Sequence, residues 1–189
     1  MKYSKNIFWK DAFTTGLYVG LALSLSVVVS YVMRDSSMLS VVNNIIVLSS
    51  IFGITLYRGK LFSKTLAKYK QPFPFVTALK YSLTSICLSG VIYGAFMYIM
   101  YNHIAEDYYR ETVVKMMEEI YKGNENSIMD IETAYDSFIH SPIYFIISSV
   151  FAMLFMGILP SLLISSIIKR NDFMEINNNS QDNNENKEI

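Results

Sequence analysis

Two histidines and two carboxylates are the side chains of this sequence best suited to bind a metal ion. His103 and Glu106 are spaced i, i+3, and Asp136 and His140 are spaced i, i+4. On a helix, either spacing places both side chains on one face, and imidazole and carboxylate groups are ligands of Zn²⁺. The four could meet if their helices lie side by side. Interfacial histidines and solvated carboxylates explain the same residues more simply, so we expect no metal site.

Other patterns that carry chemistry are missing from the sequence. It contains no glycine-rich phosphate loop, no HExxH motif and no cysteine–histidine cluster with zinc spacing. Cys87 is the single cysteine, which excludes an intrachain disulfide. No pair of carboxylates is placed for acid–base work, and nothing indicates nucleic-acid binding. We therefore expect no catalytic residues, no cofactor and no nucleic-acid partner, and we expect that the protein is not an enzyme.

Four long apolar runs are the main structural elements that the sequence predicts, and any functional site must be positioned by them. A hydrocarbon core of about 30 Å requires about 20 mostly apolar residues in a helix, and four runs without Asp, Glu, Lys, Arg or His meet this requirement: 12–33, 38–57, 81–102 and 143–168. With 52% apolar and 17% charged residues, the composition favours the bilayer as partner. The sequence predicts an all-α integral membrane protein with four transmembrane helices. The membrane domain would cover residues 1–170, and the asparagine-rich 171–189 would form a disordered tail.

The charges along the chain predict which ends of the helices face the cytoplasm. The 58–80 link carries six basic residues and no acid, whereas the 103–141 loop has three basic and nine acidic residues, a net charge of −6. Short loops rich in Lys and Arg stay in the cytoplasm. Both termini and the 58–80 link are therefore expected there. The lysines of this link would lie on anionic headgroups as a short helix or would belong to a solvated loop.

The acidic outer loop has the pattern of a helical hairpin. Within 105–122, one apolar face is formed by Tyr109, Val113, Met116, Met117 and Ile120. A second helical segment is predicted over 127–139, which begins with a capping-box pattern at Ser127. Because isolated helices this short are marginal in water, their apolar faces need a partner. That partner would be the other helix, the bilayer surface or another protein chain, and a second copy of this chain is one possibility.

Small residues within the spans predict where helices touch. Gly16 and Gly20 share one face of the first span, and Gly90 and Gly94 share one face of the third. Faces of this kind let helix backbones approach closely, and we expect packing within one chain rather than a dimer face. Within the predicted limits, no span contains an ionisable group other than tyrosines and Cys87. Ion-coupled transport usually depends on such groups.

The order of these features resembles a known bacterial family, domain of unknown function 4199. The likeness covers about residues 5–172 and rests on the two-span hairpin, the acidic outer segment and a few motifs: Tyr57-Arg58, then Phe75, Ala78 and Lys80 entering the third span, and LPSLLISSIIKR in the fourth. The resemblance implies a small four-span inner-membrane protein of Gram-negative bacteria. It implies no catalytic residues, because the family has no assigned function.

Taken together, the residues favour a non-enzymatic protein of the bacterial inner membrane. We expect it to act through protein association, with the acidic outer helical loop as its docking surface. The alternative is a small transporter or a permeation subunit, which would require a polar path through the helix bundle.

Overall fold

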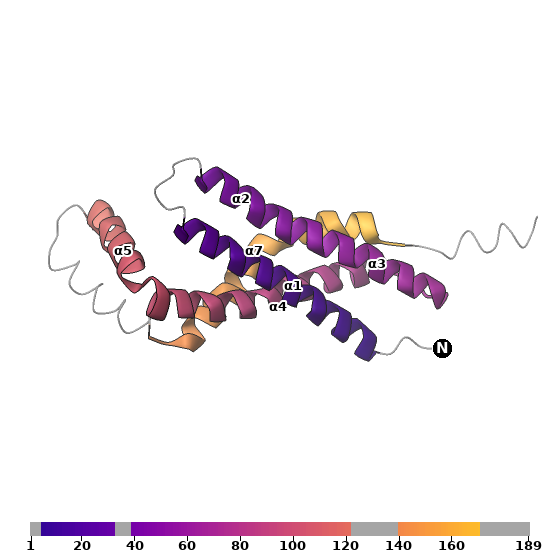
Figure 1. The fold of residues 1–189 in the computed structure, drawn as a ribbon. Helices are drawn as coiled ribbons and strands as arrows, with labels where there is room; N and C mark the ends of the chain where they lie inside the picture. The colour runs from indigo at the N-terminus through magenta and orange to yellow at the C-terminus, as the bar shows by residue number, and fades with distance from the viewer. Residues whose placement is uncertain (1–4, 33–38, 122–139, 171–189) are drawn as a thin grey trace, which may run out of the picture.

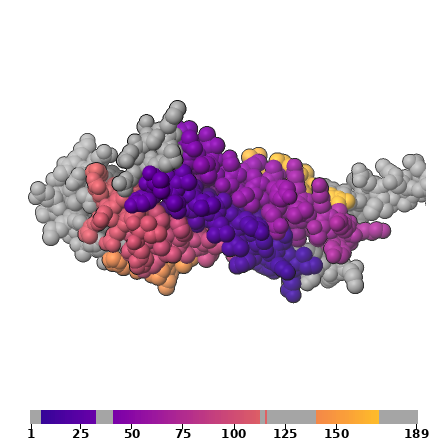
Figure 2. All heavy atoms as spheres, in the orientation of Figure 1, coloured from indigo at the N-terminus to yellow at the C-terminus, as the bar shows by residue number. Residues whose placement is uncertain are grey.

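The computed structural model describes residues 5–32, 39–121 and 140–170, which form an elongated bundle of long helices (Figures 1 and 2). The elements in chain order are α1 (Lys5–Val32), α2 (Leu39–Ser49), η1 (Ser50–Ile54), α3 (Thr55–Lys68), α4 (Phe75–Ile99), η2 (Met100–Ile104), α5 (Glu106–Tyr121) and α7 (Pro142–Ile168). The π-helical turn η1 joins α2 to α3, and the π-helical turn η2 extends α4. The predicted all-helical fold class is confirmed for these residues.

Four of the described helical stretches are long and apolar enough to cross a membrane: Asn6–Val32, Val41–Lys68, Phe75–Ile104 and Pro142–Ile168. Each of them overlaps one of the predicted apolar runs, so the four-span prediction is confirmed at this level. The first and third helices begin before their apolar runs, and the second continues beyond its run. The helices are longer than the runs because helical structure continues into the charged residues that flank them.

The two ends of the bundle differ in what they contain. The start of α1, the connection from α3 to α4 and the end of α7 lie at one end, and α5 lies at the other (Figure 1). At the first of these ends, Phe73 and Arg170 form an antiparallel backbone bridge with N–O distances of 3.1 and 2.8 Å. We call this the bridge end and the opposite one the α5 end. The bridge fixes the end of α7 against the α3–α4 connection.

The first half of the 58–80 link is helical, so the expectation of a solvated loop was wrong for this segment, whereas contact of its lysines with anionic headgroups stays a prediction. The segment up to Lys68 is the direct continuation of the second span. Its apolar residues Phe62 and Leu66 are buried in the bundle rather than in the bilayer surface. Phe62 and Leu66 can pack against protein because α1 and α4 also extend past their apolar runs and lie beside this part of α3. The lysines occupy the exposed side of the same helix.

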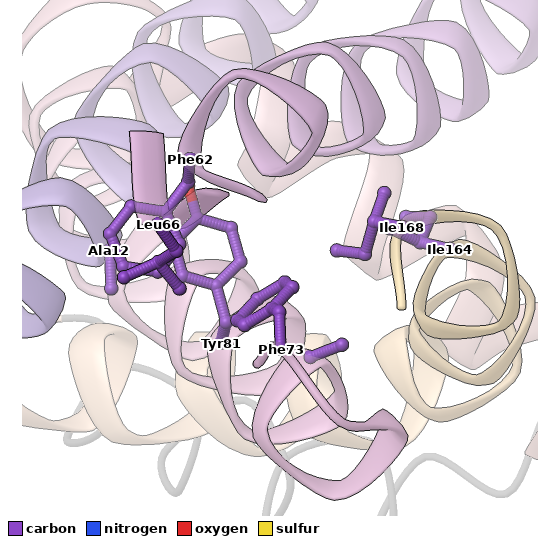
Figure 3. Packing of buried hydrophobic residues seen from close by; sticks show 8 residues of the cluster. Ala12, Phe62, Leu66, Phe73, Tyr81, Ile164 and Ile168 are labelled. Atoms are coloured by element: carbon purple, nitrogen blue, oxygen red, sulfur yellow. The ribbon is translucent and has the colours of Figure 1, made fainter. Parts of the chain in front are cut away.

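A compact aromatic and aliphatic cluster closes the bridge end (Figure 3). It contains one residue or more from each of the four long helices and from the α3–α4 connection: Ala12, Phe62, Leu66, Phe73, Ala78, Tyr81, Ile164 and Ile168. The rings of Phe62 and Tyr81 stack with centroids 5.0 Å apart and an interplanar angle of 7°. Van der Waals packing of this kind is the main attraction between helices in a membrane.

The small residues lie where helices pack within the chain, as predicted. Gly90 and Gly94 on α4 face α7, and Gly16 and Gly20 on α1 face α4. A methyl group added at Gly94 would lie 2.6 Å from the backbone oxygen of Phe145, and one added at Gly16 would lie 2.7 Å from a backbone oxygen of α4. These glycines are therefore required for the close approach of α1, α4 and α7.

Candidate functional site

Four polar side chains from three helices meet just inside the bridge end. Asp11 and Thr15 are one turn apart on α1, Arg58 lies in the first half of α3, and Tyr81 lies in the second turn of α4. Thr15 and Tyr81 are fully buried, whereas the side chains of Asp11 and Arg58 are 23% and 20% exposed. We call these four residues the charged cluster. It is the part of the described bundle in which oppositely charged side chains from different helices meet.

Both carboxylate oxygens of Asp11 accept strong hydrogen bonds. Arg58 donates from Nη2 to Oδ1 over 2.6 Å, and the Tyr81 hydroxyl donates to Oδ2 over 2.6 Å. The hydroxyls of Thr15 and Tyr81 are 2.7 Å apart. Since Tyr81 uses its proton on Asp11, Thr15 is the donor of this bond. Arg58 also reaches the Thr15 hydroxyl from Nε over 3.4 Å. The cluster is thus a connected network with a net charge of zero.

The surroundings of the network are mostly apolar and aromatic. The Tyr81 ring is stacked on Phe62 and touches Phe8 edge-on with centroids 6.0 Å apart. The Arg58 guanidinium carbon lies 5.8 Å from the centroid of the Tyr18 ring, within reach of a cation–π contact. Because the side chains of Asp11 and Arg58 are mostly buried, their two charges interact more strongly than those of an exposed pair would. The cluster can hold α1, α3 and α4 in one register.

The sequence pattern had not identified this network. The statement that no span contains a charged group holds for the predicted limits but not for the helices that form, because Asp11 and Arg58 both lie inside them. Two signals pointed to the cluster. Asp11 is the single acid among the first 34 residues, and Arg58 is the single arginine of the 58–80 link, whose other basic residues are all lysines. Arginine is favoured over lysine for partly buried pairing with a carboxylate.

The candidate metal ligands do not form a cluster in the described part of the chain. His103 is exposed, and its ring lies edge-on to Tyr98. Nδ1 of His140 is instead 3.0 Å from the Asn102 side-chain oxygen. Glu106 is exposed. No group of three His, Cys, Asp or Glu side chains that could hold a metal occurs among the described residues. Asp136, the fourth candidate, lies outside them.

At the α5 end, the predicted outer helix exists, and its first turns are anchored to the bundle. The predicted range 105–122 corresponds to α5. The ring of Tyr109 stacks on Tyr101 at the end of the third span with centroids 3.9 Å apart, and Tyr108 contacts Tyr31 of α1 with centroids 5.6 Å apart. Burial raises the pKa of Tyr109 to about 12. Tyr109, the first residue of the predicted interaction face, is therefore used within the chain.

The rest of that face is described only by its backbone. Val113, Met116, Met117 and Ile120 lie on α5, whose helix continues to Tyr121, but their side chains are outside the described structure. The predicted second helix over 127–139 is also outside the described residues. Among the described elements, α5 makes its main contacts with η2.

A hollow of about 520 Å³ lies between the start of α5 and the end of α1. Its lining combines three carboxylates with two tyrosines and two apolar residues: Tyr31, Ile104, Ala105, Glu106, Asp107, Tyr108 and Glu111. Acidic and aromatic side chains together suit a positively charged group, because both attract a cation. The sequence pattern did not indicate this hollow, because Tyr31 is far from α5 in the sequence.

Four apolar helices with a charged cluster between three of them define a multi-pass membrane protein. A family model described as "Protein of unknown function (DUF4199)" matches residues 14–170, and the chain belongs to this family. The predicted resemblance is thereby confirmed. The match includes Thr15, Arg58 and Tyr81, and it begins shortly after Asp11. No curated protein and no solved structure matches the chain. The description of the family assigns no activity to any residue.

Proposed function

We propose that this protein is a non-enzymatic component of a bacterial inner membrane that works by binding another protein through its outer loop. The observation that carries the proposal is the placement of α5. This helix is amphipathic by sequence, and its described side-chain contacts with the bundle involve its first turn, around Tyr108 and Tyr109. By their spacing in the sequence, the apolar residues Val113, Met116, Met117 and Ile120 would supply the surface for a partner.

The charge of the outer loop favours a particular kind of partner. Residues 103–141 carry a net charge of −6, and two copies of such a loop would repel each other at short range. A different protein with a basic surface would be attracted instead, and its arrival would be accelerated by long-range steering. A lysine or arginine of that partner would fit the hollow lined by Glu106, Asp107 and Tyr31. We therefore propose a basic protein partner rather than a second copy of this chain.

This proposal requires that the α5 end face away from the cytoplasm. Basic residues support that orientation, because they are concentrated at the bridge end on α3, on the α3–α4 connection and at the end of α7. The positive-inside rule then places the bridge end and both termini in the cytoplasm. The acidic outer loop would lie on the opposite side of the membrane.

Reporter fusions test the orientation directly. Fusions at the C-terminus and after Tyr69 should report a cytoplasmic location, and a fusion near Gly123 should report the exterior. The physical reason is the energetic and translocation barrier against moving a short basic loop across the membrane. A C-terminal reporter that is active outside the cell would overturn the orientation.

A pair of aspartate substitutions tests the docking surface. Met116→Asp combined with Ile120→Asp should abolish crosslinking of the outer loop to its partner in membranes. Burying one unpaired charge costs several kcal/mol, and two would be buried in the same contact. The measurement is crosslinking from a photoreactive residue at position 117 in intact membranes, with the crosslinked band analysed for a second protein.

The matched control uses two charged residues of the same helix. Lys115→Ala and Glu118→Ala should each change stability by less than about 0.5 kcal/mol and leave the crosslink in place. Lys115 is exposed and pairs with Glu111 one turn earlier over 2.6 Å, and exposed pairs of this kind contribute little. Equal and negligible effects of the aspartate pair and the controls would show that α5 is a solvated spacer.

A small transporter or permeation subunit is the second candidate, and the charged cluster favours it. An ionisable pair within transmembrane helices is a common feature of ion pathways. If Asp11 took part in such a pathway, Asp11→Asn would abolish uptake of a test ion into vesicles that contain the purified protein, while the thermal stability would decrease as well. Under the association proposal, vesicles with and without the protein should take up ions at the same rate.

A further inference from the structure

Five lysines from four parts of the chain surround the bridge end. Two of them are on the last turns of α3, one is in the α3–α4 connection, one is in the second turn of α4, and one directly follows α7: Lys64, Lys68, Lys70, Lys80 and Lys169. All five are exposed. Among the described residues, Asp11 is the one acid near this end, and its charge is paired with Arg58. Within residues 5–32, 39–121 and 140–170, the bridge end therefore carries a strong positive charge with no second carboxylate beside it.

These lysines are held in place by backbone structure. At the end of α3, the amide of Gln71 donates to the Leu66 carbonyl over 3.1 Å, and the amide of Lys70 donates to the Ala67 carbonyl over 2.9 Å. This is the hydrogen-bond pattern of a Schellman turn, in which glycine normally occupies the left-handed position. Lys70 occupies it here with a φ of 51°, the single non-glycine residue with positive φ in the described chain. A lysine thus occupies a position where glycine would fit more easily.

The connection after Lys70 is fixed just as firmly. Phe73 is completely buried in the core cluster, and its backbone is paired with Arg170. Lys169 is therefore held close to the α3–α4 connection, although 98 residues lie between it and Lys70 in the sequence. Cations from distant parts of the chain thus share one rigid surface. If the lysines served only to set the orientation of the protein in the membrane, a flexible loop would be sufficient, and neither the turn at Lys70 nor the Phe73–Arg170 bridge would be needed.

Exposed apolar side chains adjoin the lysines on the side toward the membrane. On α7, Leu163 and Ile167 are exposed along the turns that lead to Lys169. A molecule with an anionic group and long hydrocarbon chains would match both parts of this surface, because its charge would meet the lysines and its chains would lie along the helices.

We propose that the bridge end binds the headgroup of an anionic phospholipid, with Lys70 and Lys169 as central contacts. Lysines near a membrane surface are attracted to anionic headgroups, and long side chains can extend to headgroup depth. A soluble phosphate shares the headgroup chemistry but lacks acyl chains to cover Leu163 and Ile167. The lipid is therefore the favoured source of the anion. The proposal does not depend on whether the outer loop binds a protein.

The test compares the thermal stability of the full-length protein in nanodiscs of two compositions. We expect a higher Tm in discs that contain phosphatidylglycerol than in discs of phosphatidylcholine alone, since a ligand that binds the folded state stabilises it. Lys70→Gly should keep or raise the Tm in phosphatidylcholine, because glycine suits the left-handed position. The same variant should lose at least half of the shift caused by the anionic lipid. In this variant, the Tm in phosphatidylcholine reports the stability of the fold, and the shift caused by phosphatidylglycerol reports lipid binding.

Additional variants and a soluble anion complete the test. Lys68→Gln combined with Lys169→Gln should also reduce the shift, while Lys115→Gln at the α5 end should leave it unchanged. Glycerol 3-phosphate added to phosphatidylcholine discs should give no shift. The lipid proposal is wrong if glycerol 3-phosphate reproduces the effect, or if Lys70→Gly keeps the full shift. It is also wrong if neutralising the five acids of the 171–189 tail lowers the Tm in phosphatidylcholine alone, which would identify the tail as the occupant.

Discussion

Replacing Gly94 by alanine is expected to destabilise the protein by about 3 kcal/mol or more, at the upper end of the usual range for overpacking. The new methyl group would lie 2.6 Å from the Phe145 oxygen and 2.8 Å from the Ile146 Cα, and both are backbone atoms of α7. A flexible side chain could move aside, but a helix backbone cannot do so without separating α4 from α7. This helix pair has the most extensive contact in the bundle. Thermal or denaturant unfolding in a mild detergent measures the loss.

Gly53→Ala is the matched control for this substitution. Gly53 lies in η1, and a methyl group added there would meet no atom within 4 Å. Since glycine is less favourable than alanine within a helix by up to about 1 kcal/mol, the control should be neutral or slightly stabilising. If both variants unfolded at the same point, the close contact between α4 and α7 would not contribute to stability. Gly94→Ala should also leave the oligomeric state unchanged, because its contact is within the chain.

The second large effect is expected for Arg58→Met. This substitution removes the positive partner of Asp11 and leaves a largely buried carboxylate with one hydrogen bond from Tyr81 but without a compensating charge. Breaking a buried pair in this way costs about 3–5 kcal/mol. We expect the lower end of this range, because about a fifth of each side chain is exposed. The protein should unfold earlier, and α1 should become more accessible to proteases near its start.

A double-mutant cycle separates the ion pair from general damage. Asp11→Asn together with Arg58→Met leaves no unpaired charge, so the double variant should be more stable than Arg58→Met alone. The exposed pair of Lys115 and Glu111 provides the comparison, and Lys115→Ala there should change stability by less than about 0.5 kcal/mol. Strictly additive effects of Asp11→Asn and Arg58→Met would show that the two side chains do not interact.

The sequence determined the membrane class, the number of long apolar helices and the presence of a helix after the third one. These features follow from composition and periodicity, because a helix that crosses hydrocarbon needs an uninterrupted apolar run and an amphipathic helix needs a regular spacing. The sequence also predicted that the glycine faces of the first and third spans contact other helices, since small residues at i and i+4 permit close packing. Gly94 and Gly16 had no other evident role in their spans.

The tertiary structure alone decided how the charged residues are used. Asp11, Arg58 and Tyr81 stand far apart in the sequence, and each looked like an ordinary residue at a helix boundary. Their convergence depends on α1, α3 and α4 extending beyond the apolar runs and ending at the same level. Likewise, the bridge between Phe73 and Arg170 brings Lys169 to the α3–α4 connection. Apolar runs encode the length that a membrane requires, but the pairing of charges depends on distances between helices, which local sequence patterns do not contain.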